Sequence, residues 1–244
     1  RLHLNIRTES AARWITSESW EACGNRELVI GDFAGQKCWM GLDLASNSDF
    51  TGAVFAFSEL GAVYVFPYFW VPKQAALKRE RKSRIPYTVW ERQGHLIFTA
   101  GNETDYDAVR RDLNTIVRQH KLNVVEIAAD RLFQGMDICR RLDEDDGFEV
   151  IEHGQGFVSM AMPTKETERM ILGQRLGHPD HPVLNWMVAN TTVQEDAAGN
   201  RKPDKKRSSE KIDGVVAMIM GVGRAVTNAG PPTSVYATRG LRML

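Results

Sequence analysis

The side chains of this chain that are best suited to chemistry are carboxylates placed where predicted strands and helices end or begin. Asp43 is the first of them, and it lies near the exit of the short apolar segment 37–45, which has the pattern of a buried strand. An ionised carboxylate in such a place is costly unless another group compensates it. Four turn formers at 46–49 and a second apolar run at 52–57 follow, and they predict a polar turn and an antiparallel return strand. Taken alone, Asp43 is better explained as a turn cap, so its interpretation depends on whether other carboxylates converge on it.

A second carboxylate, Asp130, ends the predicted strand 124–130. The preceding segment 104–120 carries apolar residues at spacings of three and four, which predicts a helix. A helix that leads into a strand implies a parallel crossover onto the sheet. If this strand lies beside the first, Asp130 comes close to Asp43 at the same edge. Glu126 shares the face of Asp130 and is a candidate for direct or indirect contact with the acidic centre, with a neutralised or hydrogen-bonded support as the simpler alternative.

The third carboxylate, Asp213, falls in the first turns of the last predicted helix, which is expected to open at Ser208 or Ser209. The positive end of the helix dipole favours an anion there. Asp is also common near helix starts, and this is the structural alternative. Asp49, in the turn after the first strand, is a further candidate for contact with the acidic centre, although a turn cap explains it more simply.

Two segments concentrate positive charge and predict a phosphate-contacting surface. The first is the run 78–84, for which a solvated helix face is the alternative. The second is the far arm of a predicted hairpin within 191–211, which has Gly199-Asn200 at its tip, a composition typical of hairpin turns. The candidate DNA-binding residues in and beside these segments are Lys78, Arg79, Arg81, Lys82, Arg84, Arg201, Lys202, Lys205, Lys206, Arg207 and Lys211.

The composition excludes a uniformly basic nucleic-acid binder. The chain has 244 residues with 31 basic and 31 acidic side chains, so its formal net charge is zero, which still allows local basic patches around an acidic centre. This length fits one large domain or a domain with an extension. Three unevenly spaced cysteines favour reduced thiols in a cytoplasmic setting. No apolar run reaches membrane-spanning length, and no signal peptide opens the chain.

The remaining elements complete an α/β pattern. The return strand is expected over 53–58, further strands are predicted at 63–69, 96–98 and 148–151, and further helices at 16–23, 134–142 and 164–176. The strand at 63–69 is apolar on both faces, so we expect helices to cover both faces of the sheet. The acidic cluster 143–146 is expected to be a solvated turn. Segment 177–182 contains two histidines and an aspartate, but without a nearby cysteine or third histidine a proline-rich loop is favoured over a zinc site.

Three motifs of the chain carry a resemblance to a known family. The nuclease domain of the large terminase subunit of tailed bacteriophages is similar to this chain at Gly41-Leu42-Asp43-Leu44-Ala45, at Ala129-Asp130-Arg131, and at Lys211-Ile212-Asp213-Gly214-Val215-Val216-Ala217. The last motif is the most specific, and the preceding hairpin with Lys205 also looks like that of the family. The resemblance covers residues 36–226. In one departure, the family's second aspartate often follows an aromatic residue, whereas Ala129 precedes Asp130 here.

The resemblance implies a ribonuclease-H-like mixed sheet with helices on both faces, and a metal-dependent endonuclease that cuts concatemeric viral DNA during genome packaging. It carries the family's catalytic metal ligands over to Asp43, Asp130 and Asp213, which would bind two Mg²⁺ or Mn²⁺ ions. Hard cations prefer carboxylate oxygens, and two such ions can activate water and stabilise the leaving oxygen of a phosphodiester. Asp49 and Glu126 would then lie around these ligands.

The resemblance also implies a domain organisation. Residues 1–35 would be a linker or extension after an ATPase domain that is absent here, because the sequence has no Gly-x-x-x-x-Gly-Lys-Ser/Thr loop. Residues 36–227 would form the nuclease domain and residues 228–244 a flexible tail. Double-stranded DNA would be the substrate. The small terminase subunit, the portal and the missing ATPase domain would be partners in a packaging complex of the host cytoplasm, with no role for a membrane.

Two other functions remain open from the sequence. Another ribonuclease-H-like enzyme, such as a junction resolvase or a transposase core, would share the acidic triad but not the sequence around Asp213. A non-catalytic module that docks on DNA or on a portal-like partner would use the basic segments, and its carboxylates would be structural. Metal-dependent nicking of plasmid DNA separates the docking module from both enzymes.

Overall fold

A mixed sheet of seven strands forms the centre of the protein. The computed structural model describes residues 13–44, 48–130 and 135–228. Six strands follow the order β4-β3-β2-β1-β5-β6, and β7 pairs with β3. The strands are β1 (Lys37–Asp43), β2 (Thr51–Glu59), β3 (Ala62–Pro72), β4 (Ile97–Thr99), β5 (Asn123–Ala129), β6 (Val150–Glu152) and β7 (Leu176–Gly177).

The register around β1 confirms the strand pairing that the sequence predicts. β1 runs antiparallel to β2, with Asp43 opposite Gly52. On its other side β1 runs parallel to β5, with Leu42 opposite Ala129. The next residues along these two parallel strands are Asp43 and Asp130, so both aspartates leave the sheet at the same edge.

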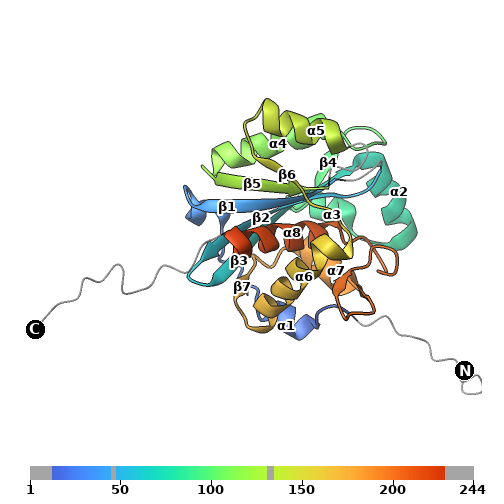
Figure 1. The fold of residues 1–244 in the computed structure, drawn as a ribbon. Helices are drawn as coiled ribbons and strands as arrows, with labels where there is room; N and C mark the ends of the chain where they lie inside the picture. Colours follow the sequence, from blue (N-terminus) through green and yellow to red (C-terminus); the bar gives the residue numbers. More distant parts are fainter. Residues whose placement is uncertain (1–12, 45–47, 131–134, 229–244) are drawn as a thin grey trace, which may run out of the picture.

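Helices cover both faces of the sheet, as predicted. The helices are α1 (Ser17–Glu21), α2 (Lys73–Ser83), α3 (Tyr87–Arg92), α4 (Tyr106–Gln119), α5 (Gly135–Glu144), α6 (Phe157–Leu172), α7 (Pro182–Asn190) and α8 (Asp213–Asn228), with a 3₁₀ helix at Ile30–Phe33. Figure 1 shows α4 and α5 on one face and α8, α6 and α7 on the other. The predicted hairpin also forms, from β8 (Val193–Glu195) and β9 (Arg201–Pro203), with Gly199 at a positive φ of 80°.

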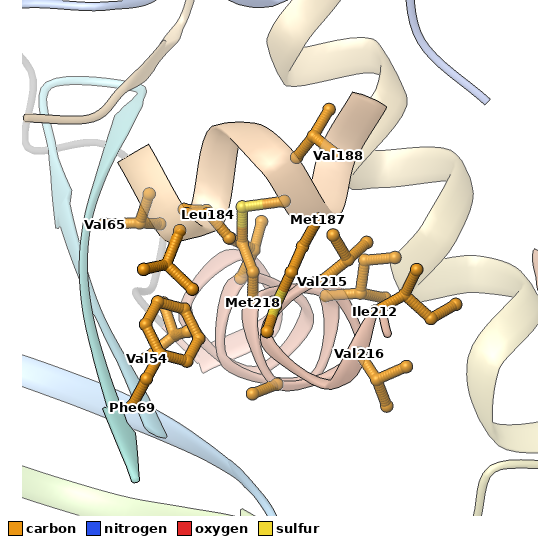
Figure 2. Close-up of a cluster of buried hydrophobic side chains, with 14 of the residues drawn as sticks. Val54, Val65, Phe69, Leu184, Met187, Val188, Ile212, Val215, Val216 and Met218 are labelled. Carbon is orange, nitrogen blue, oxygen red and sulfur yellow. The ribbon is translucent and has the colours of Figure 1, made fainter. Parts of the chain in front are cut away.

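Helix α8 is the central element of one of the two hydrophobic cores. Its side chains Val215, Val216 and Met218 pack among Phe69 of β3 and Met187 of α7 (Figure 2). The other core lies beneath α4 and α5 and joins them to the opposite face of β1 and β2. Strands β1 and β2 are buried at almost every position, because helices cover both faces of the sheet.

Glycine at position 41 permits the close contact of α8 with β1. A Cβ atom at Gly41 would lie 1.9 Å from the carbonyl oxygen of Ala217 and 2.7 Å from the amide nitrogen of Gly221. Any larger residue would therefore push the helix away from the strand. Because α8 begins with Asp213, this contact also controls where that carboxylate lies.

Two sequence expectations about where helices begin are wrong. Helix α6 begins at Phe157 rather than at 164 and continues through Pro163 to Leu172, because Pro163 packs against Gly223 of α8. Helix α8 begins at Asp213 rather than at the preceding serines. Ser208 instead donates its hydroxyl to the carbonyl of Asp204, and Ser209 donates to Asn190.

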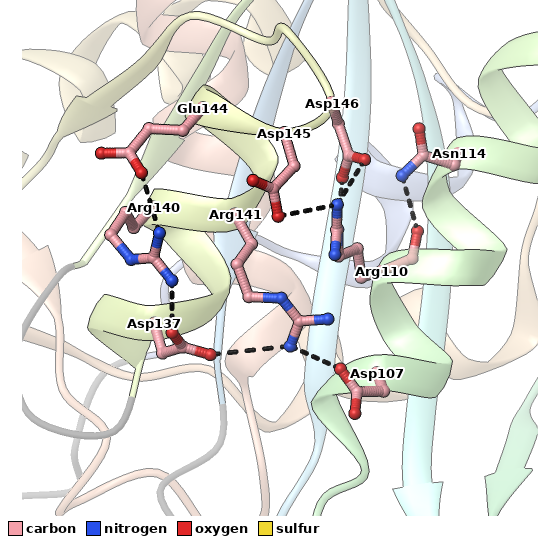
Figure 3. A network of polar contacts seen from close by, with 9 residues as sticks. All are labelled: Asp107, Arg110, Asn114, Asp137, Arg140, Arg141, Glu144, Asp145 and Asp146. Carbon is pink, nitrogen blue, oxygen red and sulfur yellow. Dashed lines mark hydrogen bonds and ion pairs between the residues drawn. The ribbon is translucent and has the colours of Figure 1, made fainter.

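The acidic cluster 143–146 is more structured than a solvated turn. Asp146 accepts two hydrogen bonds from Arg110, at 2.6 and 2.7 Å, and its side chain is 13% exposed. Asp145 lies 3.2 Å from the same guanidinium, as Figure 3 shows. These ion pairs join the end of α5 to α4, and they were invisible in the sequence because the arginine comes from another helix.

The described part of the amino-terminal segment packs against the main body. Trp14 and Trp20 are 4% exposed and belong to the core around α8. The ring of Trp20 stacks on that of His178 at 3.9 Å. His178 is thereby held within the fold. The predicted tail after Asn228 lies outside the described residues.

Two further properties bear on the class of protein. Cys23, Cys38 and Cys139 are buried and form no disulfide. Among the described residues, no helix combines the length and the apolar character needed to span a bilayer.

Candidate active site

Asp43 is a buried carboxylate with charged and polar partners from distant parts of the chain. Its side chain is 2% exposed. One oxygen, Oδ2, accepts a hydrogen bond of 2.6 Å from the ammonium group of Lys205. The other, Oδ1, accepts a hydrogen bond of 2.8 Å from the side-chain amide of Gln155. The position of Asp43 on the central strand and these two contacts fix the carboxylate at the sheet edge.

Asp213 is brought to the same edge by the packing of α8 on the sheet. Gly52, which lies opposite Asp43 in the register, leaves room for the first turn of the helix, because a Cβ atom there would lie 3.2 Å from the backbone of Gly214. Oδ1 of Asp213 lies 3.2 Å from the ammonium nitrogen of Lys205. The ammonium group of Lys205 thus bridges Asp43 and Asp213, and the structure brings these two predicted residues together.

A turn built by Asp204 presents Lys205 to the two carboxylates. Oδ1 of Asp204 accepts hydrogen bonds from the amide nitrogens of Lys206 and Arg207, at 2.9 and 3.1 Å. Asp204 is itself 8% exposed. An aspartate that binds amides two and three residues ahead is a common local turn, so the sequence offered a signal for this residue that our sequence analysis missed.

The electrostatics of the bridge keep a positive charge between the carboxylates. Desolvation alone would lower the pKa of Lys205, but the charges of Asp43 and Asp213 outweigh it and raise the pKa above the ordinary value. Burial raises the pKa of Asp213 to about 7, and although Lys205 opposes this rise, Asp43 and Asp49 add to it. Asp213 is therefore the carboxylate that most needs a further cation nearby in order to stay ionised.

Asp130 takes the place at the edge that the register predicts. It follows Ala129 directly and is half-buried. Burial lowers the pKa of the nearby imidazole of His153, and the negative charge of Asp130 opposes part of that decrease. Arg131 of the same motif lies outside the described residues. Throughout the described ranges, no three carboxylate, imidazole or thiol groups are gathered closely enough to hold a metal ion.

Asp49 and Glu126, the two predicted supporting residues, have different surroundings. Asp49 binds Arg79 and Lys211, and its charge reaches Asp213. Glu126 forms a 2.7 Å ion pair with Arg224 of α8. Glu126 is paired with Trp39 in the register of β1 and β5, four positions before the edge residue Asp130. Its contact with Arg224 agrees with the neutralised support that was the simpler alternative.

The predicted DNA-binding residues divide into two groups. The first group is already paired within the protein: Arg79 and Lys211 with Asp49, Lys205 with the acidic pair, Arg201 with Glu168, Arg207 with Asp204, and Lys202 with the backbone of Gln155. The second group is exposed and forms no ion pair within the described residues: Lys78, Arg81, Lys82, Arg84 and Lys206. The exposed group lies on α2, at its end and on the turn after β9, and is available to an anionic partner.

Gln155 is a site residue that the sequence did not reveal. It lies in the loop between β6 and α6, and its contact with Asp43 joins positions 112 residues apart. A single glutamine beside a glycine carries no motif, so no local signal could have identified it. Lys205 was predicted as a DNA contact, and its bridging of two carboxylates became visible only in the fold.

The acidic pair fits a hard divalent cation. Oδ2 of Asp213 is buried and has no hydrogen-bond partner in the part of the chain that the structure describes, which leaves an oxygen donor unused there. The ammonium group of Lys205 shows that the space between the carboxylates accepts positive charge. Carboxylate oxygens are the donors that Mg²⁺ and Mn²⁺ prefer.

Comparison with known proteins identifies the family of the chain. Residues 1–229 match the family described as the endonuclease domain of the terminase large subunit. The chain is 37% identical over 248 residues to the terminase large subunit of Enterobacteria phage HK97, in an alignment that covers 99% of this chain and 48% of that protein. The chain thus spans about half the length of this curated relative.

Solved structures show the same fold. The crystal structure of the HK97 bacteriophage large terminase superposes with a TM-score of 0.79 at 36% identity, covering 88% of this chain and 44% of that one. The large terminase nuclease from thermophilic phage G20c with bound magnesium superposes with a TM-score of 0.52 at 12% identity, covering 78% of this chain and 82% of that one. The second likeness extends to the fold alone.

Proposed function

The chain belongs to the family of terminase large-subunit endonuclease domains, and from this premise we propose that it cleaves double-stranded DNA with the help of divalent metal ions. The observation that carries the proposal is the buried pair of Asp43 and Asp213 around one cationic group. Within a nuclease family, two carboxylates converging on a single positive charge are the arrangement that a catalytic metal ion needs.

Asp43, Asp130 and Asp213 are the residues that would hold the metal. Asp43 is oriented by Gln155, Asp213 contributes its unused buried oxygen, and Asp130 leaves the sheet beside Asp43. Two Mg²⁺ or Mn²⁺ ions, when bound, would lower the pKa of water and stabilise the leaving oxygen of the phosphodiester. Magnesium is bound by the G20c nuclease of the same fold. Lys205 would neutralise Asp43 and Asp213 until the metal arrives.

DNA would approach over the basic residues that have no partner within the described protein. Exposed lysine and arginine side chains on α2 and after β9 can contact phosphates without recognising sequence. The net charge of zero implies that this binding is local and sensitive to salt. Two residues hold the hairpin on α6 and so position the turn that carries Lys206. They are Arg201 and Lys202, and the ammonium group of Lys202 lies 5.4 Å from the ring centre of Phe157.

The cellular role that follows is the cutting of concatemeric viral DNA during genome packaging. In that role the chain would work in the host cytoplasm with an ATPase domain, a small terminase subunit and a portal. Residues 36–227 would be the nuclease domain and residues 1–35 its link to the ATPase domain. A resolvase or transposase core is less well supported, because the family match includes the segment around Asp213.

Metal-dependent nicking of supercoiled plasmid tests the proposal. We expect nicking in Mg²⁺ or Mn²⁺ and none in EDTA. The variants D43N, D130N and D213N should each cut at least about 100-fold more slowly, because each removes a charge that a metal ligand needs. D143N is the matched control. Asp143 accepts only a weak hydrogen bond, from the backbone amide of Val150, and does not belong to the acidic pair.

Thermal melting gives an independent measure of metal binding. Wild type should be stabilised by metal, by about 2.7 kcal/mol at a concentration 100-fold above Kd, and D213N should gain less. A protein that binds DNA but neither cuts it nor gains stability with any divalent metal would instead be a docking module. If D213N cuts as fast as wild type, the assignment of the acidic site is wrong.

A further inference from the structure

Asp49 holds two of the predicted DNA-binding side chains, those of Arg79 and Lys211, beside the acidic pair. Oδ1 of Asp49 accepts a hydrogen bond of 3.0 Å from Nη1 of Arg79, which comes from α2. Oδ2 of Asp49 accepts a hydrogen bond from Nζ of Lys211. One carboxylate thus joins α2 to the segment that leads into α8.

The carboxylate of Asp49 is anchored to the hydrophobic core through the next residue, Phe50. Its Oδ1 also accepts a hydrogen bond of 2.9 Å from the amide nitrogen of the next residue, Phe50. Phe50 is fully buried, and its ring stacks on that of Tyr87 of α3 at 5.6 Å. Because the carboxylate is anchored in this way, it restricts the positions of its two cationic partners.

The two cations retain hydrogen-bonding capacity for a ligand. The side chains of Arg79 and Lys211 are 28% and 39% exposed. Arg79 gives Asp49 only one nitrogen, whereas Arg110 uses two nitrogens on Asp146 and is 19% exposed. The two cations outnumber the one carboxylate that they share, and the N–H groups of a guanidinium match the oxygens of a phosphate.

The position of this cluster relative to the acidic pair decides what it would bind. Lys211 lies two residues before Asp213, and Asp49 belongs to the connection that follows Asp43 along the chain. The charge of Asp49 also acts on Asp213. A DNA strand whose scissile phosphate lies at the acidic pair would therefore place another phosphate of its backbone near Arg79 and Lys211.

We propose that Asp49, Arg79 and Lys211 form a preassembled clamp for a DNA backbone phosphate next to the one that is cleaved. In this clamp Arg79 and Lys211 contact the phosphate, and Asp49 is a positioning residue that acts only through them. Both oxygens of Asp49 accept hydrogen bonds, from three donors in all, and the proposal assigns to Asp49 the positioning of these cations rather than the binding of metal. The proposal rests on the proposed nuclease function and adds to it a defined subsite for the substrate.

Duplex binding in EDTA, followed by fluorescence anisotropy over a range of salt concentrations, tests the clamp without requiring cleavage. We expect D49N to weaken binding about tenfold, as the loss of one well-placed charged contact does. R79A and K211A should each flatten the slope of log affinity against log salt by about 0.9. D146N, which breaks the ion pair with Arg110 (Figure 3), is the matched control and should change neither quantity.

A mutant cycle separates positioning from a merely structural role. In the R79A/K211A background, D49N should cause no further loss of affinity, and in the wild-type background D49E should recover part of it. The metal-induced rise in Tm should persist in D49N, because the contacts with DNA rather than those with metal are affected.

Several results would overturn the clamp. One is an unchanged DNA affinity in D49N. Another is a further loss of DNA affinity when D49N is added to the R79A/K211A background. The third is loss of the metal-induced Tm rise in D49N, which would make Asp49 a metal ligand. If D49N does not fold, unchanged salt slopes in both R79A and K211A decide against the proposal. A wild-type protein that binds DNA but never cuts it would defeat the nuclease proposal, while the affinity measurements would still judge the clamp.

Discussion

At the scale of single residues, Lys205 controls the charge of the acidic centre. It lies 2.6 Å from Asp43 and 3.2 Å from Asp213, and its side chain is 38% exposed. Two buried carboxylates without this ammonium group would repel each other, and one of them would take up a proton. A lysine that reaches the pair from solvent can neutralise it and can also be displaced by a metal ion.

The variant K205M tests whether lysine and metal share this place. In EDTA we expect the free energy of unfolding to fall by about 2 kcal/mol, less than the 3–5 kcal/mol typical of a broken buried pair, because the lysine is partly exposed and Asp213 can protonate. Divalent metal should restore most of the loss, so the metal-induced rise in Tm should exceed that of wild type. The measurement is chemical unfolding and thermal melting with and without Mg²⁺.

K206M is the control for this prediction, because the side chain of Lys206 is exposed and contacts no carboxylate within the described residues. It should leave both stability and metal response unchanged. An equal metal-induced gain in wild type and K205M would show that the ion binds elsewhere.

At the scale of elements, the contact between α8 and β1 decides whether the site forms at all. We expect G41A to lower the free energy of unfolding by at least about 3 kcal/mol, because the added Cβ would lie 1.9 Å from the carbonyl oxygen of Ala217. Nicking should also fall, since Asp213 moves with the helix. G31A is the control, because a Cβ atom at Gly31 meets nothing within 4 Å. Urea unfolding measures both variants, and a G41A protein as stable as wild type would contradict this account.

The turn after β9 and helix α2 should contribute separately to DNA binding. Lys206 is exposed on that turn, and Lys82 is exposed on α2. We expect K206A and K82A each to flatten the salt slope of DNA affinity by about 0.9, and the double variant by about 1.8, because each contact releases its own counterions. Anisotropy titrations from low to physiological salt provide the measurement. An unchanged slope in K206A would remove the hairpin from the DNA interface.

At the scale of the whole molecule, buried histidines make the fold sensitive to acid. Burial lowers the pKa of His178, and burial together with His95 lowers that of His181 to about 3. In the fold, Nδ1 of His178 accepts a hydrogen bond from the amide of Asp180, and its other nitrogen lies 3.0 Å from the carbonyl of Trp20. Protonation would remove that acceptor, so His178 is held neutral.

The sign of the resulting pH dependence follows from these lowered pKa values. Below the ordinary histidine value of 6.5, the unfolded chain binds more protons than the folded one, so stability is complete above that pH and falls as the pH decreases. Each such histidine contributes up to about 1.4 kcal/mol per pH unit. Asp213, whose pKa is raised, acts in the opposite direction but is a single group. Tm should therefore drop between pH 7 and pH 5, with a smaller drop in H181N, and a constant Tm over this range would disprove the prediction.

The chain as a whole should not hydrolyse ATP. Its sequence contains no Gly-x-x-x-x-Gly-Lys-Ser/Thr loop, and without such a loop the phosphates of a nucleotide have no cradle of backbone amides. Phosphate release with ATP and Mg²⁺ should match a buffer blank, with and without DNA. Robust hydrolysis would contradict the assignment of the chain to the nuclease half of its longer relatives.

The amino-acid sequence by itself determined the elements and the placement of the three aspartates at their ends. Apolar runs, helical spacing and turn residues are local properties, so the strands around Asp43 and Asp130 and the helix 104–120 were readable without a fold. The parallel crossover followed from the order of these elements, and the register of β1 and β5 confirms it. Element boundaries were less secure where tertiary packing prevailed, as at Pro163 in α6.

Only the tertiary structure decided what the carboxylates touch. Gln155 and Lys205 reach Asp43 across 112 and 162 residues of sequence, and Asp49 meets Lys211 across 162. Such contacts depend on the packing of α8 against β1 through Gly41 and on the turn that Asp204 builds. The residues next to a side chain in the sequence do not determine these contacts. The contacts form because distant segments bury apolar surface against one another, and that burial drives folding.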